Sequence, residues 1–311
     1  MYRIAIGLVL AVVSLGGCTV NPTTGRSQFN ALSRDEEIAL GTEAKAQMIV
    51  QEGGEVANPE LRSYVVEIGA KLAAVTEGDN PSLPWEFTLL NSDVINAYAL
   101  PGGKVFMSRG LAEKLTSEDQ LAGVLGHEVA HVTARHINDR MARMMGAQLG
   151  LGVAGLVLGD SGATLTELGG QLAQVAMLSY DRGQELESDA LGMRYMDRVG
   201  YNPSAQGDVM RVLLEASGGG GGSDFFSTHP HPEARIAQVN ELMASTYASS
   251  ANRKQKTSEY QTRFLRKLAL EPRPLHGRAF AFGDPATWCG VCAAEAATRR
   301  NSSLPAESVT R

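Results

Sequence analysis

The sequence has 311 residues, but it has few cysteines, no excess of positive charge and no apolar run long enough to cross a membrane. Its 28 Lys and Arg residues are outnumbered by 34 Asp and Glu residues, and the formal net charge is −6. Because phosphate backbones are bound through basic surfaces, this balance argues against a nucleic acid partner. Hydrophobic residues make up 43% and charged residues 20%, as in an ordinary globular protein of one large or two modest domains.

The apolar run at residues 4–15 is shorter than the roughly 20 residues that span a bilayer. It ends in the letters LGGC, which resemble the bacterial lipobox with Cys18 as its cysteine. This resemblance implies that residues 1–17 are a lipoprotein signal peptide and that Cys18 carries the lipid. Because Thr19 follows in place of an aspartate, we expect an anchor at the periplasmic face of the outer membrane of a Gram-negative bacterium. The alternative is an ordinary signal peptide that contains a cysteine by chance.

The other two cysteines, Cys289 and Cys292, form a CxxC pair. A thioredoxin site needs a strand before this motif and a helix after it. Here the pair lies in the tail 272–311, which lacks periodicity and which we expect to be disordered. We therefore interpret the pair as a chance spacing or an exposed disulfide. A thiol oxidoreductase remains the alternative.

Hydrophobic periodicity and capping residues predict a mostly helical chain with one small sheet. Helices are expected over residues 30–52, 58–75, 117–137 and 183–199, with Ser33, Asn58 and Ser117 as capping residues of the first three. Short strands rich in β-branched and aromatic residues are expected over residues 85–91, 95–100 and 104–108. Because Pro-Gly-Gly at 101–103 is a hairpin signal, we expect these strands to form an antiparallel sheet.

The stretch HEVAH at residues 127–131 has the spacing of a metal site on a helix. Residues four apart lie about 40° from each other, so His127 and His131 can point at one ion. Glu128 flanks both of them, which is the position of a general base acting on metal-bound water. His136 lies about 140° from His131 on the same helix, so we expect it at the surface or packed beside a ligand. The alternative is a helix with scattered histidines.

A catalytic zinc needs a third protein ligand and an open position. Glu185 and Asp189 lie one turn apart at the start of the helix expected over 183–199. One carboxylate can reach the ion, and the other can orient a ligand histidine through its second ring nitrogen. We expect Glu187 to point away into solvent. The alternative is an acidic helix start favoured by the helix dipole.

Five stretches together resemble a known family: CTVNPTTGRSQFNALS (18–33), NAYALPGGKVFMSRGL (96–111), HEVAH (127–131), ELESD (185–189) and STHPHPEARI (227–236). They resemble the HtpX and CAAX-prenyl-protease class of gluzincins, metallopeptidase family forty-eight, in its bacterial lipoprotein branch. The resemblance implies an α+β, mostly helical zincin-type domain with a small antiparallel sheet next to the HExxH helix. We expect this domain over 18–245, followed by a helical extension over 246–271.

The resemblance also implies one Zn²⁺ per chain, with His127, His131 and Glu185 as ligands. Glu128 then corresponds to the catalytic base, and Asp189 to an acidic residue that supports the ligands.

A histidine and an arginine six residues apart line the active site of this family, and His229 and Arg235 match them. In some members a histidine of this loop binds the zinc and keeps the enzyme shut. We expect His229 to be that residue, with His231 as a rival, or both as solvated histidines of a proline-stiffened loop. An edge strand beside the active-site helix holds the substrate backbone, and it corresponds to Asn96, Ala97, Tyr98 and Ala99.

The activity implied is that of a zinc metalloendopeptidase acting on misfolded or stalled envelope proteins. Its partners would be those substrates, the membrane through the lipid on Cys18, and the outer-membrane assembly machinery. The alternative is a chaperone-like periplasmic binding protein with latent protease activity. In that case the edge strand and the apolar segment 144–178, expected as a buried or lid helix, would hold unfolded chains without cutting them.

Overall fold

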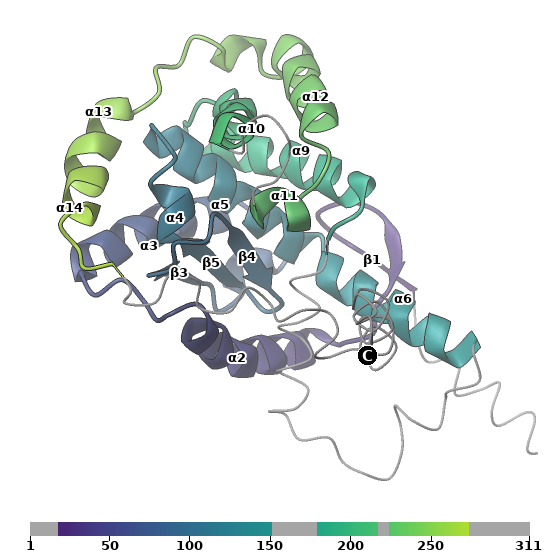
Figure 1. The fold of residues 1–311 in the computed structure, drawn as a ribbon. Helices are drawn as coiled ribbons and strands as arrows, with labels where there is room; N and C mark the ends of the chain where they lie inside the picture. The colour runs from purple at the N-terminus through teal and green to yellow at the C-terminus, as the bar shows by residue number, and fades with distance from the viewer. Residues whose placement is uncertain (1–17, 151–178, 217–223, 274–311) are drawn as a thin grey trace, which may run out of the picture. The chain divides into compact units, whose positions relative to one another are not determined.

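The computed structural model describes residues 18–150, 179–216 and 224–273, which are coloured in Figure 1. Three expectations lie outside these residues: the signal peptide, most of the apolar segment 144–178, and the cysteine pair in the tail. Among the described helices, none is both long and apolar enough to cross a membrane.

In chain order the elements are β1 (Cys18–Val20), β2 (Ser27–Phe29), α2 (Arg34–Gln51), α3 (Pro59–Ala73), η1 (Asn80–Ser82), β3 (Glu86–Leu90), β4 (Ala97–Leu100), β5 (Lys104–Ser108), α4 (Arg109–Ala112), α5 (Glu118–Thr133), α6 (His136–Gly150), α9 (Arg182–Arg198), α10 (Ala205–Ala216), α11 (Asp224–Thr228), α12 (Pro232–Ser245), η2 (Ala248–Ser250), α13 (Thr257–Glu259), η3 (Tyr260–Leu265) and α14 (Arg266–Leu268). Helices dominate and the strands are few, so the predicted α+β class is confirmed.

Three of the predicted helices begin where the capping signals indicate. Ser33 and Ser117 accept hydrogen bonds from backbone N–H groups of α2 and α5, and Asn58 does so for α3. These side chains satisfy N–H groups that have no partner inside the helix. Local sequence therefore defines these helix starts.

The predicted helix over 117–137 is in fact two helices. α5 ends at Thr133, and α6 begins at His136. Between them Arg135 has a left-handed backbone conformation with φ of 58°. Its guanidinium donates to Glu37 Oε1 at 2.9 Å and to the Leu32 carbonyl at 2.8 Å. These contacts stabilise a conformation that is uncommon for a residue other than glycine, and the chain changes direction there.

The main sheet has the order β3-β5-β4. β4 and β5 form the predicted hairpin, but β3 pairs with β5 in parallel, so the sheet is mixed and the expectation of an antiparallel sheet was wrong in this detail. The turn sequence predicts that β4 and β5 pair with each other, but no sequence signal predicts which of these two strands β3 pairs with. β3 joins β5, and Lys104 Nζ lies 2.5 Å from Glu86 Oε1 where the two strands begin. β4 is left at the edge of the sheet.

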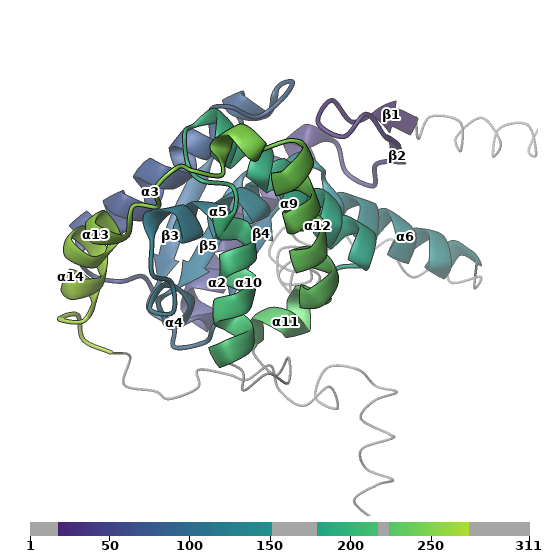
Figure 2. The ribbon, with the colours of Figure 1, turned by 90° about the horizontal axis from the view of Figure 1, so that it is seen from above.

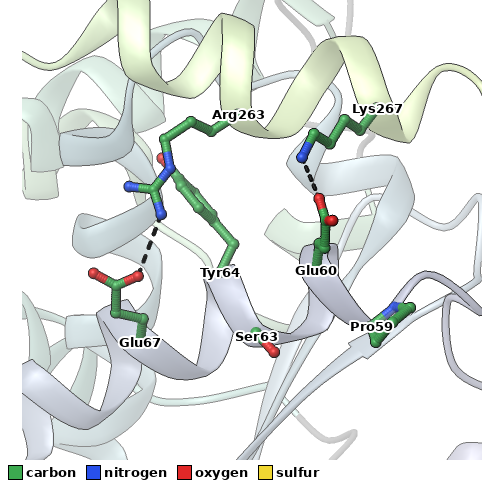
Figure 3. Close-up of a pocket in the computed structure, with 7 residues that line it drawn as sticks. All are labelled: Pro59, Glu60, Ser63, Tyr64, Glu67, Arg263 and Lys267. Carbon is green, nitrogen blue, oxygen red and sulfur yellow. Dashed lines mark hydrogen bonds and ion pairs between the residues drawn. The ribbon is translucent and has the colours of Figure 1, made fainter.

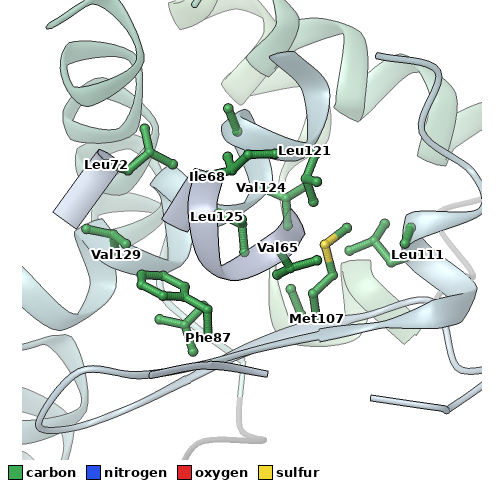
Figure 4. Packing of buried hydrophobic residues seen from close by; sticks show 14 of the residues in the cluster. Val65, Ile68, Leu72, Phe87, Met107, Leu111, Leu121, Val124, Leu125 and Val129 are labelled. Carbon is green, nitrogen blue, oxygen red and sulfur yellow. The ribbon is translucent and has the colours of Figure 1, made fainter. Parts of the chain in front are cut away.

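Helices α3 and α5 pack together on the sheet. In Figure 4, Val65 and Ile68 of α3 meet Leu125 and Val129 of α5, with Phe87 of β3 beside them. Burying one such side chain contributes about 1.5–3 kcal/mol. All 16 residues of α5 are buried, so the helix that carries HEVAH is held on every side.

Candidate metal centre

The two histidines of HEVAH point the same nitrogen in the same direction. His127 Nε2 lies 2.9 Å from His131 Nε2, and both side chains are buried. The second nitrogen of each ring has another partner, because His127 Nδ1 contacts Asp189 Oδ1 at 2.8 Å and His131 Nδ1 contacts His136 Nδ1 at 2.8 Å. The two Nε2 atoms are therefore available to a common cation.

Helix α9 brings the carboxylates to these histidines because it crosses α5 at two glycines. A β-carbon on Gly192 would lie 3.0 Å from the Gly126 carbonyl carbon and 3.0 Å from the His127 backbone nitrogen. Such contacts are tighter than those of most side chains, so any residue larger than glycine would press the two backbones apart. Figure 2 shows α9 beside α5, with α12 next to α9.

Four buried side chains converge at this crossing: His127, His131, Glu185 and His229. One ligand atom from each lies within 4.8 Å of the others. Tetrahedral zinc with bonds of about 2.0–2.1 Å has ligand atoms about 3.3 Å apart.

Three of the observed separations lie close to that value. His127 Nε2 lies 3.5 Å from Glu185 Oε2 and 3.3 Å from His229 Nδ1, and His131 Nε2 lies 3.4 Å from Glu185 Oε1. Three imidazoles and one carboxylate are a donor set that zinc prefers. The residues present therefore fit a zinc ion.

Glu128 lies beside the cluster with an unused carboxylate. The side chain is fully buried, and neither of its oxygens has a hydrogen-bond partner among the residues that the structure describes. His229 Nε2 lies 3.6 Å from Glu128 Oε1. Burial raises the pKa of Glu128, although His229 and His127 act against it. A buried carboxylate of this kind can accept a proton from a group that enters the site.

Asp189 and Arg235 form a support behind the ligands. Arg235 donates to both oxygens of Asp189 at 2.6 and 2.7 Å, and its Nη1 lies 2.6 Å from Glu185 Oε2. Burial alone would raise the pKa of Asp189, but Arg235 and His127 outweigh it and lower this pKa to about 2. Burial also opposes ionisation of Glu185, and again Arg235 and His229 hold its pKa well below the ordinary value. Both carboxylates are thus held ionised.

Arg235, expected to line the active site together with His229, lies at this centre against Asp189 and Glu185. Its side chain is fully buried, and its N–H groups are directed at Asp189, Glu185 and the His229 carbonyl. Arg235 is therefore placed as a positioning residue.

The two candidate gate histidines lie in different environments. His229 is buried at the end of α11, with its ring stacked on Phe225 at a centroid distance of 4.7 Å. His231 is exposed at the start of α12, in a left-handed conformation with φ of 64°. The structure brings His229, and not His231, to the cluster.

The segment proposed for substrate binding lies at the sheet edge beside α5. Ala97, Tyr98 and Ala99 belong to β4, and Asn96 precedes it; all four are buried. Thr228 Oγ1 lies 3.3 Å from Asn96 Oδ1. The segment that carries His229 is therefore attached to the same strand.

Two further residues at this centre were not predicted to be there, and a third, His136, lies in one of its two expected places, packed beside a ligand. The ring of Tyr180 stacks on His131 at 3.8 Å, and His136 is fully buried behind His131. Glu187, expected in solvent, lies 2.9 Å from His136 Nε2. The helical spacing could not show His136, because the helix breaks at Arg135.

A second charged region lies away from this centre, between α3 and the C-terminal helices (Figure 3). It is a groove of about 410 Å³, called the α3 groove below, and it is lined by Pro59, Glu60, Ser63, Tyr64, Glu67, Arg263 and Lys267. Its charged side chains pair with one another, as Lys267 does with Glu60 and Arg263 with Glu67. None of its residues belongs to the metal cluster.

Comparison with known families also indicates a metal centre at this cluster. The model of peptidase family M48 matches residues 59–243, which include all four residues of the cluster. The chain belongs to peptidase family M48. This confirms the predicted family, the class of enzyme, a metallopeptidase, and zinc as its cofactor.

Individual relatives are similar to this chain over a longer stretch than the family model. The Beta-barrel assembly-enhancing protease of Yersinia pestis is 32% identical over 245 residues, which cover 74% of this chain and 49% of that protein. Its counterpart in Escherichia coli K12 is 31% identical over 226 residues, which cover 70% of this chain and 46% of that protein. The mitochondrial metalloendopeptidase OMA1 of Schizosaccharomyces pombe is 30% identical over 233 residues, which cover 71% of this chain and 65% of that protein. This M48 chain spans about half the length of the first two relatives.

Proposed function

We propose that this M48 chain is a zinc-dependent metalloendopeptidase in which Glu128 is the general base. One observation carries the proposal: Glu128 is fully buried with an unpartnered carboxylate, beside a cluster of four zinc-type ligands. A buried carboxylate without a partner is costly to a fold, so it points to a function at this position. Membership of family M48 supports the same conclusion.

When bound, zinc supplies a Lewis acid that polarises the peptide carbonyl and makes water a nucleophile near neutral pH. Glu128 accepts the proton of the attacking water and later returns it to the leaving amine. Because burial raises the pKa of this carboxyl group, Glu128 is a stronger base than an exposed glutamate. Asp189 and Arg235 hold His127 and Glu185 in place for this step.

We propose that the described conformation is closed. A catalytic zinc keeps three protein ligands and one open position, and His127, His131 and Glu185 already provide three. His229 Nδ1 is a fourth ligand atom, 3.1 Å from Glu185 Oε1. Substrate can therefore enter only when His229 leaves.

The same movement would open the substrate strand. An extended peptide adds to a sheet edge through backbone hydrogen bonds, and β4 is an edge strand that is buried in the described conformation. Asn96 is held by Thr228, the residue before His229. Displacement of Thr228 and His229 together would free both the metal position and the strand from Asn96 to Ala99.

As substrates we propose misfolded or stalled proteins of the cell envelope, with the outer-membrane assembly machinery as partner. The support is the likeness to proteases named for β-barrel assembly. The lipobox-like sequence before Cys18 supports a lipid anchor at the periplasmic face of the outer membrane.

The direct test is the Glu128→Gln variant, assayed on an unfolded protein substrate at matched zinc content. Loss of the base should lower the rate of cleavage by about 10²–10⁴-fold. The matched control is His231→Gln, an exposed polar change close to the site, which should cleave like the wild type. Undiminished cleavage by Glu128→Gln would refute this mechanism. Rescue of a deletion strain by the same variant would favour the chaperone-like alternative.

The closed state has its own test. The His229→Ala variant should cleave faster than the wild type when both are assayed without any activating partner. Equal rates would show that His229 does not close the site.

A further inference from the structure

His127 and His131 are supported in different ways, although they are adjacent on α5. His127 contacts a carboxylate directly, through Asp189. His131 instead contacts a third histidine, His136, with 2.8 Å between the two Nδ1 atoms. His136 is fully buried and is not one of the four clustered ligands.

The ring nitrogens have one consistent assignment of hydrogens. Because His131 Nε2 faces the cluster, its hydrogen is on Nδ1 and is donated to His136 Nδ1. The hydrogen of His136 is then on Nε2, which lies 2.9 Å from Glu187 Oε2 and donates to it. Ser188 Oγ, at 3.3 Å, is a second neighbour of His136 Nδ1.

Glu187 is held in turn from the N-terminal segment. Arg26, which precedes β2, donates to the same Glu187 oxygen at 2.7 Å. The side chain of Arg26 is 42% exposed and that of Glu187 is 24% exposed, so the chain of contacts runs from the buried centre to the surface.

We propose that His136 is a positioning residue for His131, and that Glu187 and Arg26 complete a relay from the zinc centre to the N-terminal hairpin β1–β2. This rests on the zinc centre of the proposed function and adds residues that do not bind the metal. The relay fixes which nitrogen of His131 is free and the direction in which its ring points. Groups that hold a ligand in this way typically contribute 10–100-fold to metal affinity.

Two nearly isosteric variants separate positioning from packing. In His136→Asn the amide oxygen can take the place of Nδ1, so the acceptor for His131 is kept and the contact with Glu187 is lost. In His136→Gln the amide reaches the place of Nε2, so the contact with Glu187 is kept and the acceptor for His131 is lost. His136→Leu removes both contacts. His231→Asn is the exposed control.

The measurement is the zinc affinity of the full chain, by competition with a chromophoric chelator, with circular dichroism as the check of folding. We expect His136→Gln and His136→Leu to bind zinc at least about tenfold more weakly, and His136→Asn to stay within about threefold of the wild type. Equal losses in Asn and Gln variants, or no loss in either, would overturn the proposal. Because cleavage is not measured, the result is independent of the test on Glu128.

The link between the relay and the N-terminal hairpin can be tested with two arginines of similar exposure, one in the relay and one outside it. Arg26→Met removes the contact with Glu187, whereas Arg62→Met removes a surface pair with Glu55 of similar exposure, 40% for the arginine. Arg26→Met should weaken zinc binding by about twofold to threefold, and Arg62→Met should leave it unchanged. Equal affinities in the two variants would disprove the link to the hairpin.

Discussion

Charged side chains are paired in two regions of this molecule, but the pairs differ in their surroundings. Asp189 and Arg235 are fully buried, and the guanidinium contacts both oxygens of the carboxylate. In the α3 groove, Glu67 and Arg263 lie 3.4 Å apart, and their side chains are 47% and 55% exposed. Burying charges is costly even when they are paired, whereas exposed pairs cost and contribute little. Of these two pairs, the costly one lies at the metal centre, where it holds ligands.

The largest difference between the two regions should appear when one cation is removed from each. Arg235→Leu leaves Asp189 and Glu185 buried without their partner, which should cost about 3–5 kcal/mol of unfolding free energy. Arg263→Leu should cost less than about 1 kcal/mol. Denaturant unfolding of both variants measures the two values. Similar losses would show that the buried and the exposed pair do not differ in their contribution to stability.

A smaller effect is expected where α9 touches α5. Gly192→Ala puts a β-carbon 3.0 Å from backbone atoms of Gly126 and His127, and such overpacking costs about 1–3 kcal/mol. Zinc affinity should fall with it, because the carboxylates of α9 are displaced. Gly183→Ala, on the same helix but near only a flexible side-chain oxygen of Asp181, is the control. Thermal unfolding and zinc titration of both variants measure these effects. A Gly192→Ala variant with wild-type stability and unchanged zinc affinity would contradict the prediction.

The pH dependence of stability should also separate the regions. The pKa of Asp189 is lowered from 3.8 to about 2, so its contribution is complete above pH 3.8 and is lost as the pH falls through about 2. In the zinc-free protein, the difference in unfolding free energy between wild type and Asp189→Asn should shrink as the pH falls from about 4 through about 2. A difference that does not shrink over this range would show that the pKa of Asp189 is not lowered in the folded protein.

The smallest expected effect is that of salt. At about 1 M salt, exposed charges are screened over about 3 Å, so any loss of stability in Arg263→Leu should disappear. The loss in Arg235→Leu should remain, because buried pairs are screened much less. Repeating the unfolding experiments at low and high salt makes this comparison, and equal salt dependence of the two variants would count against it.

Much of the site was predictable because short-range patterns decide it. The spacing of His127, Glu128 and His131 on a helix and the acidic pair Glu185 and Asp189 one turn apart depend only on helix geometry. The same holds for the caps at Ser33, Asn58 and Ser117. These features need no knowledge of what packs against them.

Other features were missed because they depend on distant contacts. His136 was expected either at the surface or packed beside a ligand, and the choice depends on the turn at Arg135. That turn is stabilised by Glu37 and Leu32, about a hundred residues earlier. The parallel pairing of β3 with β5 also follows from how the strands pack, since no turn joins them.

The sequence by itself determined the ligand types and their spacing on α5 and α9, the starts of three helices, and the family to which those motifs belong. Only the tertiary structure decided that His229 and not His231 reaches the cluster, that Arg235 supports ligands, and that His136 stands behind His131. The physical reason is the distance along the sequence over which each interaction acts. Helical spacing and capping act over a few residues, whereas these three placements require segments that are far apart in the sequence to be packed against one another first.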